Sequence, residues 1–542
     1  MNKHQQFLSI VSVVAVMVSS PVQADEFKQK RLSNKINSPG YSKIVTMANS
    51  MGGLNKILSF KVQEFVAEGS RFEPEQAKKP GGEFKSVGHY NQKLVKVFDK
   101  QQSVTDWDIN VQYPFIEQRS FTEVINGKQG AVYGFDTIVA PPQAPMLNTR
   151  LGARVKQNLV SSPLALIHRA KRLSAQVKYM GTAEFHGRQQ HIVSIPGWDQ
   201  AIKLFIDVKT KLPSKVETME DDAVYGDTRW EVIFTNWSEA NGVKVPVTLQ
   251  HRINGRLINS EIRSSINLTK TVDPTQFTIP AELQTAFNMD QFSWGLRSSQ
   301  WFNRMLAFAI PFDLDQRSAA ISQIVEVAPK VFHAKSLTHH SMIIEMKDYL
   351  IVTEAPLYEE RSQVVISEIK QRWPNKPIKY LVVTHFHNDH VGGLRAYAET
   401  GATIIVGSQT KDHYEAIIKA PHTVFPDAYS KNPVDVTIKT VEAGHELILS
   451  DGYRNVRIFD VANRHAIGTL VPFVEDANLV FVSDLYSPEF FAPLIPQLFL
   501  GWSEDLLAAL SVSPLDIQWI IGGHGGVSSY DTFVTQVESS LK

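Results

Sequence analysis

The sequence predicts a two-part α/β protein in which a mainly antiparallel β region precedes an α/β region. Three observations support this fold class. Hairpin signals recur before residue 285, apolar strands alternate with helical segments after residue 325, and several of these later strands end at a single histidine or aspartate. We therefore expect a β-rich domain over residues 25–285, a connector over 286–320 and an α/β domain over 321–542.

The first 24 residues have the composition of a secretory signal peptide. A mainly apolar stretch of 12 residues, "FLSIVSVVAVMV", follows a lysine-containing start and precedes the small residues of "SSPVQA". Because a membrane-spanning helix needs about 20 apolar residues, we favour a cleaved signal peptide over an uncleaved anchor. The predicted location is therefore periplasmic or secreted, with a mature chain that begins near Asp25 and has no integral membrane span.

Composition and charge limit the kinds of molecule that this protein is expected to bind. The 542 residues are 43% apolar and 20% charged, which is typical of a soluble globular protein. Lysine plus arginine equals aspartate plus glutamate at 55 each, so no overall positive field exists to attract nucleic acid. The chain has no cysteine, which excludes thiol nucleophiles and thiolate metal ligands. We expect a small-molecule substrate and no nucleic-acid partner.

Residues 25–285 show successive β-hairpin signals. "TRWEVIFTNW" is followed by the turn "SEANG" and the strand "VKVPVTLQHR", and "INGRLINSEI" supplies a further Asn-Gly turn. Helical spacing of apolar residues predicts one helix in this region, over residues 162–177. The expected structure is a largely antiparallel sheet.

The repeated hairpins, including "DVKTKLPSKVE" and "NGVKVPVTL", resemble the open β-barrel of periplasmic lipoprotein carriers. The resemblance implies a concave apolar cradle for a ligand, although no motif in it is specific. We favour a structural or partner-docking domain over a ligand cradle.

Residues 286–320 are rich in aromatic side chains and lack strand alternation. We predict a helical connector packed between the two parts. A membrane-surface segment is the alternative, and the small number of cations in this stretch disfavours it.

The pattern of predicted elements changes after residue 325, where strands begin to alternate with helices. "SMIIEM" and "YLIVTEAP" predict two strands, "RSQVVISEIKQRW" predicts an amphipathic helix, and "IKYLVV" predicts a buried strand. Strands that alternate with helices are typical of an α/β domain.

A dense cluster of potential metal ligands follows that buried strand. "HFHNDH" places His385, His387, Asp389 and His390 within six positions. On α/β sheets, ligands are commonly displayed where a strand ends and a loop begins. The first two histidines can converge on one ion, while the aspartate and the last histidine can face a second. Imidazole and carboxylate suit zinc, with iron and manganese as alternatives.

Three further potential ligands follow apolar strands. His465 precedes the glycine-containing turn of "HAIGT", Asp484 ends "LVFVSD", and His524 ends "IQWIIGGH". Each would be an ordinary loop residue by itself. Their order and spacing after the histidine cluster predict that they complete a metal site.

Together these motifs resemble the ordered metal motifs of the metallo-β-lactamase superfamily over about residues 325–542. The resemblance implies an αββα sandwich with two divalent metal ions, zinc being the expected metal. Carried over position by position, it implies a first ion held by His385, His387 and His465, a second held by Asp389, His390 and His524, and Asp484 as the bridge.

One residue departs from the pattern of the superfamily. Glu354 in "VTEAP" stands where family members commonly carry aspartate. That residue usually supports the ligand loop, so the departure concerns the support of the loop more than metal binding. The wider sequence looks like a little-characterised exported branch of the superfamily. We expect His339 and His340 to be structural residues at a strand end.

The resemblance implies hydrolysis by a hydroxide that bridges the two ions, with Asp389 as the catalytic residue that orients it and accepts its proton. Asp484 as a bridge looks like the glyoxalase-II, lactonase and phosphodiesterase branches. The expected substrate carries an ester, lactone, thioester or amide bond, and β-lactam hydrolysis is not favoured.

Two alternative functions stay open. One is a mononuclear iron enzyme similar to persulfide dioxygenases, and the other is a binding protein for an apolar ligand with a vestigial metal site.

The segment "DLYSPEFFAPLIPQLFLGW", residues 484–502, is apolar and contains three prolines. Its side chains either pack on the amino-terminal half or form a lid over the metals that favours apolar acyl or alkyl groups. In the second case Phe490 and Phe491 would contact the substrate. Tyr486 could donate a hydrogen bond to the oxyanion, although we favour a tyrosine packed at the sheet end.

Overall fold

The computed structural model describes residues 38–136, 141–198, 200–298, 323–336, 338–512 and 515–542. The predicted signal peptide and most of the predicted connector, 286–320, lie outside these ranges. In the described part of the connector, residues Met289–Arg297 form helix α5. The domain boundaries remain predictions.

The β-rich region forms one sheet of 13 antiparallel strands, which confirms the predicted type of structure. The strand order is β6-β5-β4-β3-β2-β1-β13-β12-β11-β10-β9-β8-β7, so β1 to β6 run outward to one edge, and β7 to β13 run inward from the other edge until β13 pairs with β1. The strands are β1 (Val62–Glu73), β2 (Lys85–Val97), β3 (Gln102–Val111), β4 (Glu117–Asn126), β5 (Gln129–Phe135), β6 (Gln143–Pro145), β7 (Lys178–Phe185), β8 (Arg188–Pro196), β9 (Ala201–Asp207), β10 (Pro213–Asp222), β11 (Gly226–Ala240), β12 (Val243–Ile253) and β13 (Arg256–Thr269).

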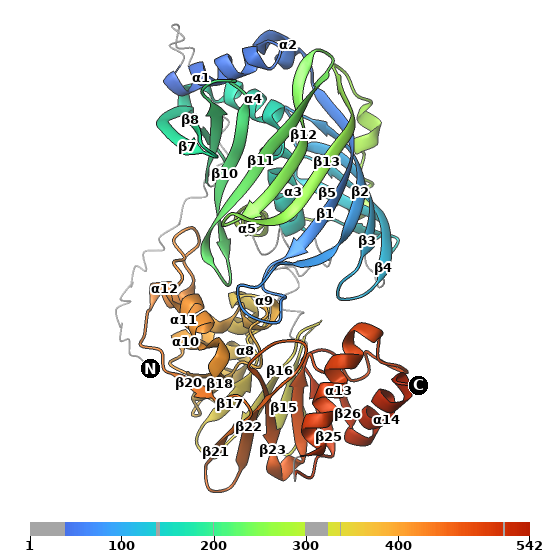
Figure 1. Cartoon of the computed structure of the whole chain (residues 1–542), viewed down its shortest axis with the longest axis vertical. Helices are drawn as coiled ribbons and strands as arrows, with labels where there is room; N and C mark the ends of the chain where they lie inside the picture. Colours follow the sequence, from blue (N-terminus) through green and yellow to red (C-terminus); the bar gives the residue numbers. More distant parts are fainter. Residues whose placement is uncertain (1–37, 137–140, 199, 299–322, 337, 513–514) are drawn as a thin grey trace, which may run out of the picture. The chain divides into compact units, whose positions relative to one another are not determined.

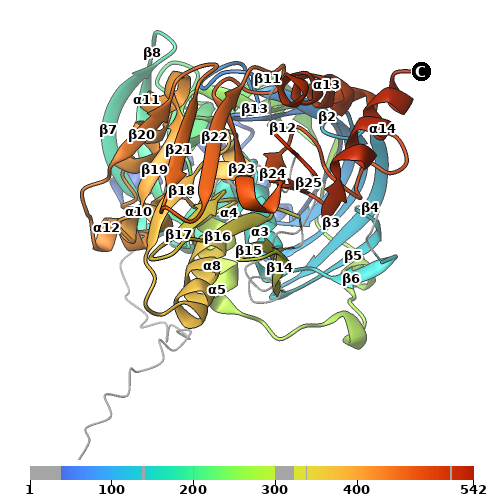
Figure 2. The same cartoon turned by 90° about the horizontal axis from the view of Figure 1, so that it is seen from below.

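Helices cover the concave face of this sheet, and α3 and α4 lie inside its curve (Figures 1 and 2). The predicted helix over 162–177 is α4 (Pro163–Arg172), which starts with a proline after the Ser162 cap. The helices α1 (Pro39–Ser50), α2 (Leu54–Ser59) and α3 (Asn148–Val160) were not predicted. Buried side chains of α4 pack in one cluster with those of the sheet. The apolar face is therefore covered by the region's own helices, which favours the structural role over an open cradle.

The α/β region contains two further sheets. The first has seven strands in the order β14 to β20, antiparallel up to β17 and parallel from β17 to β20, and the second has six strands in the order β21 to β26. The strands are β14 (Gln323–Ala328), β15 (Val331–Lys335), β16 (Ser341–Glu345), β17 (Leu350–Thr353), β18 (Ile378–Val382), β19 (Thr403–Gly407), β20 (Ile438–Val441), β21 (Glu446–Ser450), β22 (Asn455–Val461), β23 (Thr469–Val474), β24 (Leu479–Ser483), β25 (Trp519–Gly522) and β26 (Val527–Ser529).

These two sheets pack face to face between layers of helices. Ile351 of the first sheet shares a buried cluster with Ile458 and Phe481 of the second. The helices α8 (Glu359–Arg372), α10 (Leu394–Glu399) and α11 (Lys411–Lys419) pack on the outer face of the first sheet. The helices α13 (Gln497–Ser511) and α14 (Tyr530–Ser540) pack on the outer face of the second. This arrangement confirms the predicted αββα sandwich.

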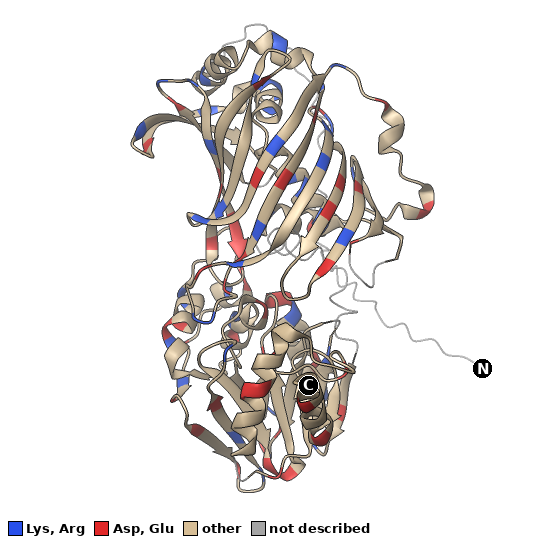
Figure 3. Cartoon of the chain, turned by 45° about the vertical axis from the view of Figure 1, so that its right-hand side comes forward, with Lys and Arg blue, Asp and Glu red and all other residues tan. Residues whose placement is uncertain are grey.

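Charges of both signs are interleaved over the strands and helices drawn in Figure 3. This distribution agrees with the equal numbers of cationic and anionic residues in the sequence. Among the described residues, no helix is both long and apolar enough to cross a membrane.

Candidate metal centre

The histidine motif lies where β18 ends and the chain turns into the short helix α9 (Asn388–Val391). His385 and His387 lie on the extended segment before this helix, and Asp389 and His390 lie in its first turn. All three histidines are almost fully buried. The change from extended to helical backbone lets four side chains that are close in sequence converge from two directions.

The first cluster brings together His385, His387, His465 and Asp484, with one ligand atom of each within 4.8 Å of the others. The Nε2 atoms of His385 and His465 are 3.2 Å apart. His387 Nε2 donates a hydrogen bond to the carbonyl of Ala77 at 2.9 Å, so its lone pair is on Nδ1. These are the residues that sequence reasoning predicted for the first ion.

The second cluster consists of His339, Asp389, His390 and His524, again within 4.8 Å. Asp484 links the two clusters. Its Oδ1 lies 3.0 Å from His390 Nε2 and its Oδ2 lies 3.4 Å from His465 Nε2. One carboxylate thus presents an oxygen to each cluster, as expected for a bridging ligand.

His339 was expected to be a structural strand-end residue, and this expectation needs correction. The structure places its Nε2 3.2 Å from Asp389 Oδ2, inside the second cluster. It was missed because it lies before strand β16 and no apolar run precedes it. His340 does have a structural contact, since its Nδ1 accepts a hydrogen bond from the backbone N–H of Ser336 at 3.0 Å.

Glu354 is fully buried and supports the ligand motif, as its position after β17 suggested. Its Oε2 accepts a hydrogen bond from His390 Nδ1 at 2.9 Å. Its Oε1 accepts hydrogen bonds from Ser483 at 2.7 Å and from the Thr384 hydroxyl. The single carboxylate therefore orients one ligand directly and braces the neighbours of two others.

Burial and charge act differently on the histidines. Burial, reinforced by neighbouring imidazoles, holds the pKa of His385 well below its ordinary value and lowers that of His387 to about 3. Burial also lowers the pKa of His390, but the carboxylates of Asp484 and Glu354 outweigh it and raise that pKa well above the ordinary value. The neutral imidazoles are in the form that binds metals, and the carboxylates favour a positive charge at the centre.

The donor set fits divalent metal ions. His387 Nδ1 is buried without a hydrogen-bond partner, and His390 Nε2 and His524 Nε2 both face Asp484 Oδ1, at 3.0 and 3.2 Å. Because leaving buried polar atoms unsatisfied is costly, such a group of converging atoms is best explained by a cation that they bind. Histidine nitrogens with carboxylate oxygens suit zinc and are also compatible with iron or manganese.

A cavity of about 410 Å³ opens beside the second cluster. The polar part of its lining includes the cluster residues His339, Asp389, Asp484 and His524. The apolar part comes from two distant segments of the chain and includes Tyr113, Pro114, Phe115, Phe490, Phe491, Phe499 and Trp502.

The three aromatic residues that were candidates for substrate contact have different positions. Phe490 and Phe491 line the cavity, and the Phe490 ring centroid lies 5.3 Å from that of Phe115 in the β-rich region. The segment 484–502 therefore both packs on the amino-terminal part and faces the centre. Tyr486 does not line the cavity, because it is fully buried and its hydroxyl bonds to Gln536. This position corrects its inclusion among the candidates for substrate contact.

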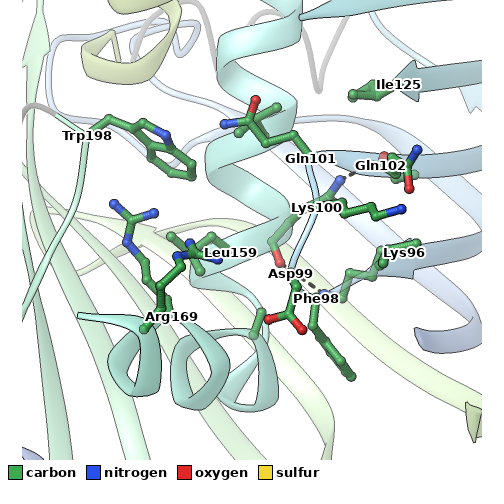
Figure 4. Close-up of a pocket in the computed structure, with 16 residues that line it drawn as sticks. Lys96, Phe98, Asp99, Lys100, Gln101, Gln102, Ile125, Leu159, Arg169 and Trp198 are labelled. Atoms are coloured by element: carbon green, nitrogen blue, oxygen red, sulfur yellow. Dashed lines mark hydrogen bonds between the residues drawn. The ribbon is translucent and has the colours of Figure 1, made fainter. Parts of the chain in front are cut away.

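A smaller cavity of about 150 Å³ lies in the β-rich region between the β2–β3 turn, α3 and α4 (Figure 4). Arg169 and Trp198 line one side of it, and Lys96 and Lys100 line the other. Arg169 already donates hydrogen bonds to the carbonyls of residues 196 and 197. The lining of this smaller cavity contains no histidine, so the candidate metal ligands are those beside the larger cavity.

Comparisons with known proteins agree with this geometry. Residues 339–524 match the family model described as the metallo-beta-lactamase superfamily. A linear primary-alkylsulfatase of a Pseudomonas species is 24% identical over 141 residues, a match that covers 26% of this chain. This match spans only 24% of the length of that relative.

Similar solved structures include two metallo-β-lactamases. The DIM-1 enzyme is 14% identical, with a TM-score of 0.30 over 40% of this chain and 97% of its own. The enzyme from Pontibacter korlensis is 14% identical, with a TM-score of 0.31 over 41% of this chain and 99% of its own. The family match spans the ordered histidines and aspartates from His339 to His524, so this part of the chain is similar to the metallo-β-lactamase superfamily.

Proposed function

We propose that this chain is a divalent-metal-dependent hydrolase whose substrates carry an apolar group. The observation that carries the proposal is the position of the ligand clusters at the wall of the aromatic cavity. Asp389, Asp484 and His524 belong to the clusters and also line the cavity. A substrate bound there would therefore reach the metal centre directly.

The ligand sets support two ions, with zinc as the proposed metal. His385, His387 and His465 would hold one ion, Asp389, His390 and His524 would hold the other, and Asp484 would contact both. When bound, such ions lower the pKa of water and polarise the bond under attack. His339 is a further candidate ligand at the second ion, because it lies in the same cluster.

Asp389 is the proposed general base. Its side chain is 18% exposed and lines the cavity, so water can reach it. Its Oδ1 accepts a hydrogen bond from Gln76 Nε2 at 2.7 Å, which restricts rotation of the carboxylate. A carboxylate held in this way can orient an attacking water and accept its proton.

The aromatic lining supports an ester, lactone, thioester or amide with an acyl or alkyl chain as the substrate. Phe115, Phe490 and Phe491 line the cavity and offer apolar contacts there. An alkyl sulfate ester is a second candidate, favoured by the alkylsulfatase relative and by Lys335, which lines the same cavity and could neutralise a sulfate group.

The test is metal analysis of the purified protein followed by a panel of carboxylic esters, lactones and alkyl sulfates of increasing chain length. We expect bound zinc, turnover that a chelator abolishes, and a preference for longer chains. Metal-loaded protein that hydrolyses none of these compounds would contradict the proposal. Bound iron with oxygen uptake would favour the oxygenase alternative.

We also propose that the protein is exported. The support is the sequence of residues 1–24, which lie outside the described residues. Amino-terminal sequencing of the protein from a cell-envelope fraction should give a start near Asp25, whereas a protein retained in the cytoplasm with its first residues intact would contradict export.

A further inference from the structure

The loop between β1 and β2, residues 74–84, extends from the β-rich region to the metal centre. Its base is fixed, because the buried Glu75 accepts a hydrogen bond from the Tyr225 hydroxyl at 2.5 Å. Further along, the Lys78 carbonyl accepts a hydrogen bond from the backbone N–H of Ile467 at 2.9 Å. The loop is therefore bonded both to its own sheet and to the α/β region.

The side chain of Gln76 in this loop contacts the ligand motif. It is 9% exposed, and its Nε2 donates to Asp389 Oδ1 at 2.7 Å and to Asn388 Oδ1 at 2.9 Å. The amide thus holds one oxygen of the carboxylate. The other oxygen of Asp389 lies on the side of the second cluster, 3.6 Å from His390 Nε2.

Tyr113 determines which way this amide points. Its hydroxyl donates to Gln76 Oε1 at 2.8 Å, and the tyrosine is buried. Because Oε1 accepts this bond, the amide nitrogen must face Asp389. The hydroxyl, the amide and the carboxylate form a chain of hydrogen bonds in which each group fixes the next.

The same loop also fixes a ligand of the first cluster. The Ala77 carbonyl can only accept a hydrogen bond, so the bond from His387 Nε2 at 2.9 Å requires a proton on that nitrogen. The tautomer that results has its lone pair on Nδ1, the buried atom without a partner. Consecutive residues of one loop therefore act on ligands of both clusters.

We infer that Gln76 and Tyr113 are positioning residues of the metal centre, and that the β-rich region serves to complete this centre. The inference rests on the proposed metal-dependent function. Neither residue belongs to the ligand clusters. Each acts through Asp389, because a carboxylate with one oxygen fixed presents the other in a single direction, which favours metal binding.

The test is zinc affinity of the full-length protein, measured by competition with a chromophoric chelator, together with the visible absorption spectrum of the cobalt-loaded protein. Loss of a hydrogen-bond partner of a ligand typically weakens metal binding about 10–100-fold, and we expect a loss in this range for Gln76→Ala. Tyr113→Phe leaves the amide in place and should cause a smaller loss. Both variants should shift the cobalt spectrum, which responds to ligand geometry. Gln76→Glu should bind at least as weakly as Gln76→Ala, because a second carboxylate would face Asp389.

Matched controls exist in the same sheet. Gln92 is buried and donates to Glu261 at 2.7 Å, and the Tyr90 hydroxyl donates to the same carboxylate at 3.1 Å. Gln92→Ala and Tyr90→Phe therefore delete the same chemical groups within the β-rich region. Zinc affinity and the cobalt spectrum of these controls should match the wild type.

Three results would overturn the inference or separate it from the proposed function. If the wild type binds zinc and Gln76→Ala binds it equally well with an unchanged cobalt spectrum, the inference is wrong and the proposed function stands. If the wild type binds neither metal, both fail. If Gln76→Ala does not fold, Tyr113→Phe, which removes one oxygen atom, decides by the same two measurements.

Discussion

The two regions of this chain both bury charged side chains, but they balance them in opposite ways. In the β-rich region, Glu123 accepts hydrogen bonds from Arg150 at 2.6 Å and from Trp107 at 3.0 Å, and Arg154 lies 2.8 Å away. Burial alone would raise the pKa of Glu123, but the two guanidinium groups outweigh it and lower that pKa to about 2. This carboxylate is neutralised entirely within the chain.

In the metal centre, groups of the same kind face one another. The Nε2 atoms of His385 and His465 approach to 3.2 Å, and His387 Nδ1 is buried without a hydrogen-bond partner. A buried cluster in which opposite charges face one another stabilises a fold, whereas a buried cluster in which groups of the same kind converge indicates a functional site.

The largest expected effect is in the double variant His385→Ala, His387→Ala. It removes two nitrogen ligands of the first cluster, so metal content should fall and hydrolysis should reach background while the fold persists. Elemental analysis and circular dichroism measure the two outcomes. Stoichiometric metal retained in this variant would refute the assignment.

The corresponding change in the β-rich region should act on stability instead. Glu123→Ala removes the carboxylate that buried Arg150 and Arg154 share, and among the described residues only Arg150 keeps a second carboxylate partner, in Asp136, so the free energy of unfolding should fall by about 3–5 kcal/mol. Zinc affinity should stay unchanged, because this network is separate from the centre. Urea unfolding of metal-free protein provides the measurement, with Glu415→Ala, a change at a half-exposed carboxylate of α11, as a control near the wild type. If Glu123→Ala weakened zinc binding and left the free energy of unfolding unchanged, the proposed difference between the two regions would be wrong.

A third effect concerns the support of the ligands. Glu354→Gln keeps the size of the side chain but loses the charge that faces His390 Nδ1. We expect zinc affinity to fall about 10–100-fold, as is typical when a ligand loses its hydrogen-bond partner. Glu354→Asp keeps the charge and shortens the reach, so it should lie between this variant and the wild type in the same chelator competition. Equal affinity in all three proteins would show that the carboxylate has no role at the metal.

The fold could be predicted from the sequence where side-chain patterns follow burial. Hairpin signals predicted the large antiparallel sheet, and the alternation of strands and helices predicted the α/β domain. Helix α3 was missed because Arg150, Arg154 and Gln157 are buried in it, so it shows no continuous apolar stripe. Its charged residues are compensated by the sheet, and a single sequence does not reveal such partners.

The candidate site could be predicted where ligands are dense or follow apolar strands. His385 to His390 form a local motif, whereas Gln76 lies 313 positions from Asp389 and belongs to no motif. The sequence left two roles open for Tyr486, because a residue beside a ligand can point either way at a strand end. The tyrosine packs against Phe533 of α14, with ring centroids 4.7 Å apart.

Metal binding should also depend on pH in one direction. Burial lowers the pKa of His390, but the carboxylates of Asp484, Glu354 and Asp389 outweigh it and raise this pKa well above the ordinary value. In metal-free protein they therefore favour the positively charged imidazolium, in which both ring nitrogens carry a proton. A metal ion must displace one of these protons, so affinity should fall as pH decreases and rise as pH increases. Titration calorimetry in two buffers of different ionisation enthalpy should detect proton release. Binding without release would contradict the raised pKa.

The smallest expected effect is at the aromatic wall, where the two regions meet. Phe490 is 55% exposed and its ring contacts that of Phe115, which lies in the loop after β3. If this wall binds the apolar chain of the substrate, Phe490→Ala and Phe115→Ala should each raise the Michaelis constant for long-chain substrates by roughly 10-fold. Metal content and turnover of short-chain substrates should change little, because neither ring belongs to the ligand clusters. Ile116, the neighbour of Phe115, is 92% exposed, so Ile116→Ala is a control for the loop. Equal losses for short and long chains, or a lower melting temperature, would leave these two rings only a packing role between the regions.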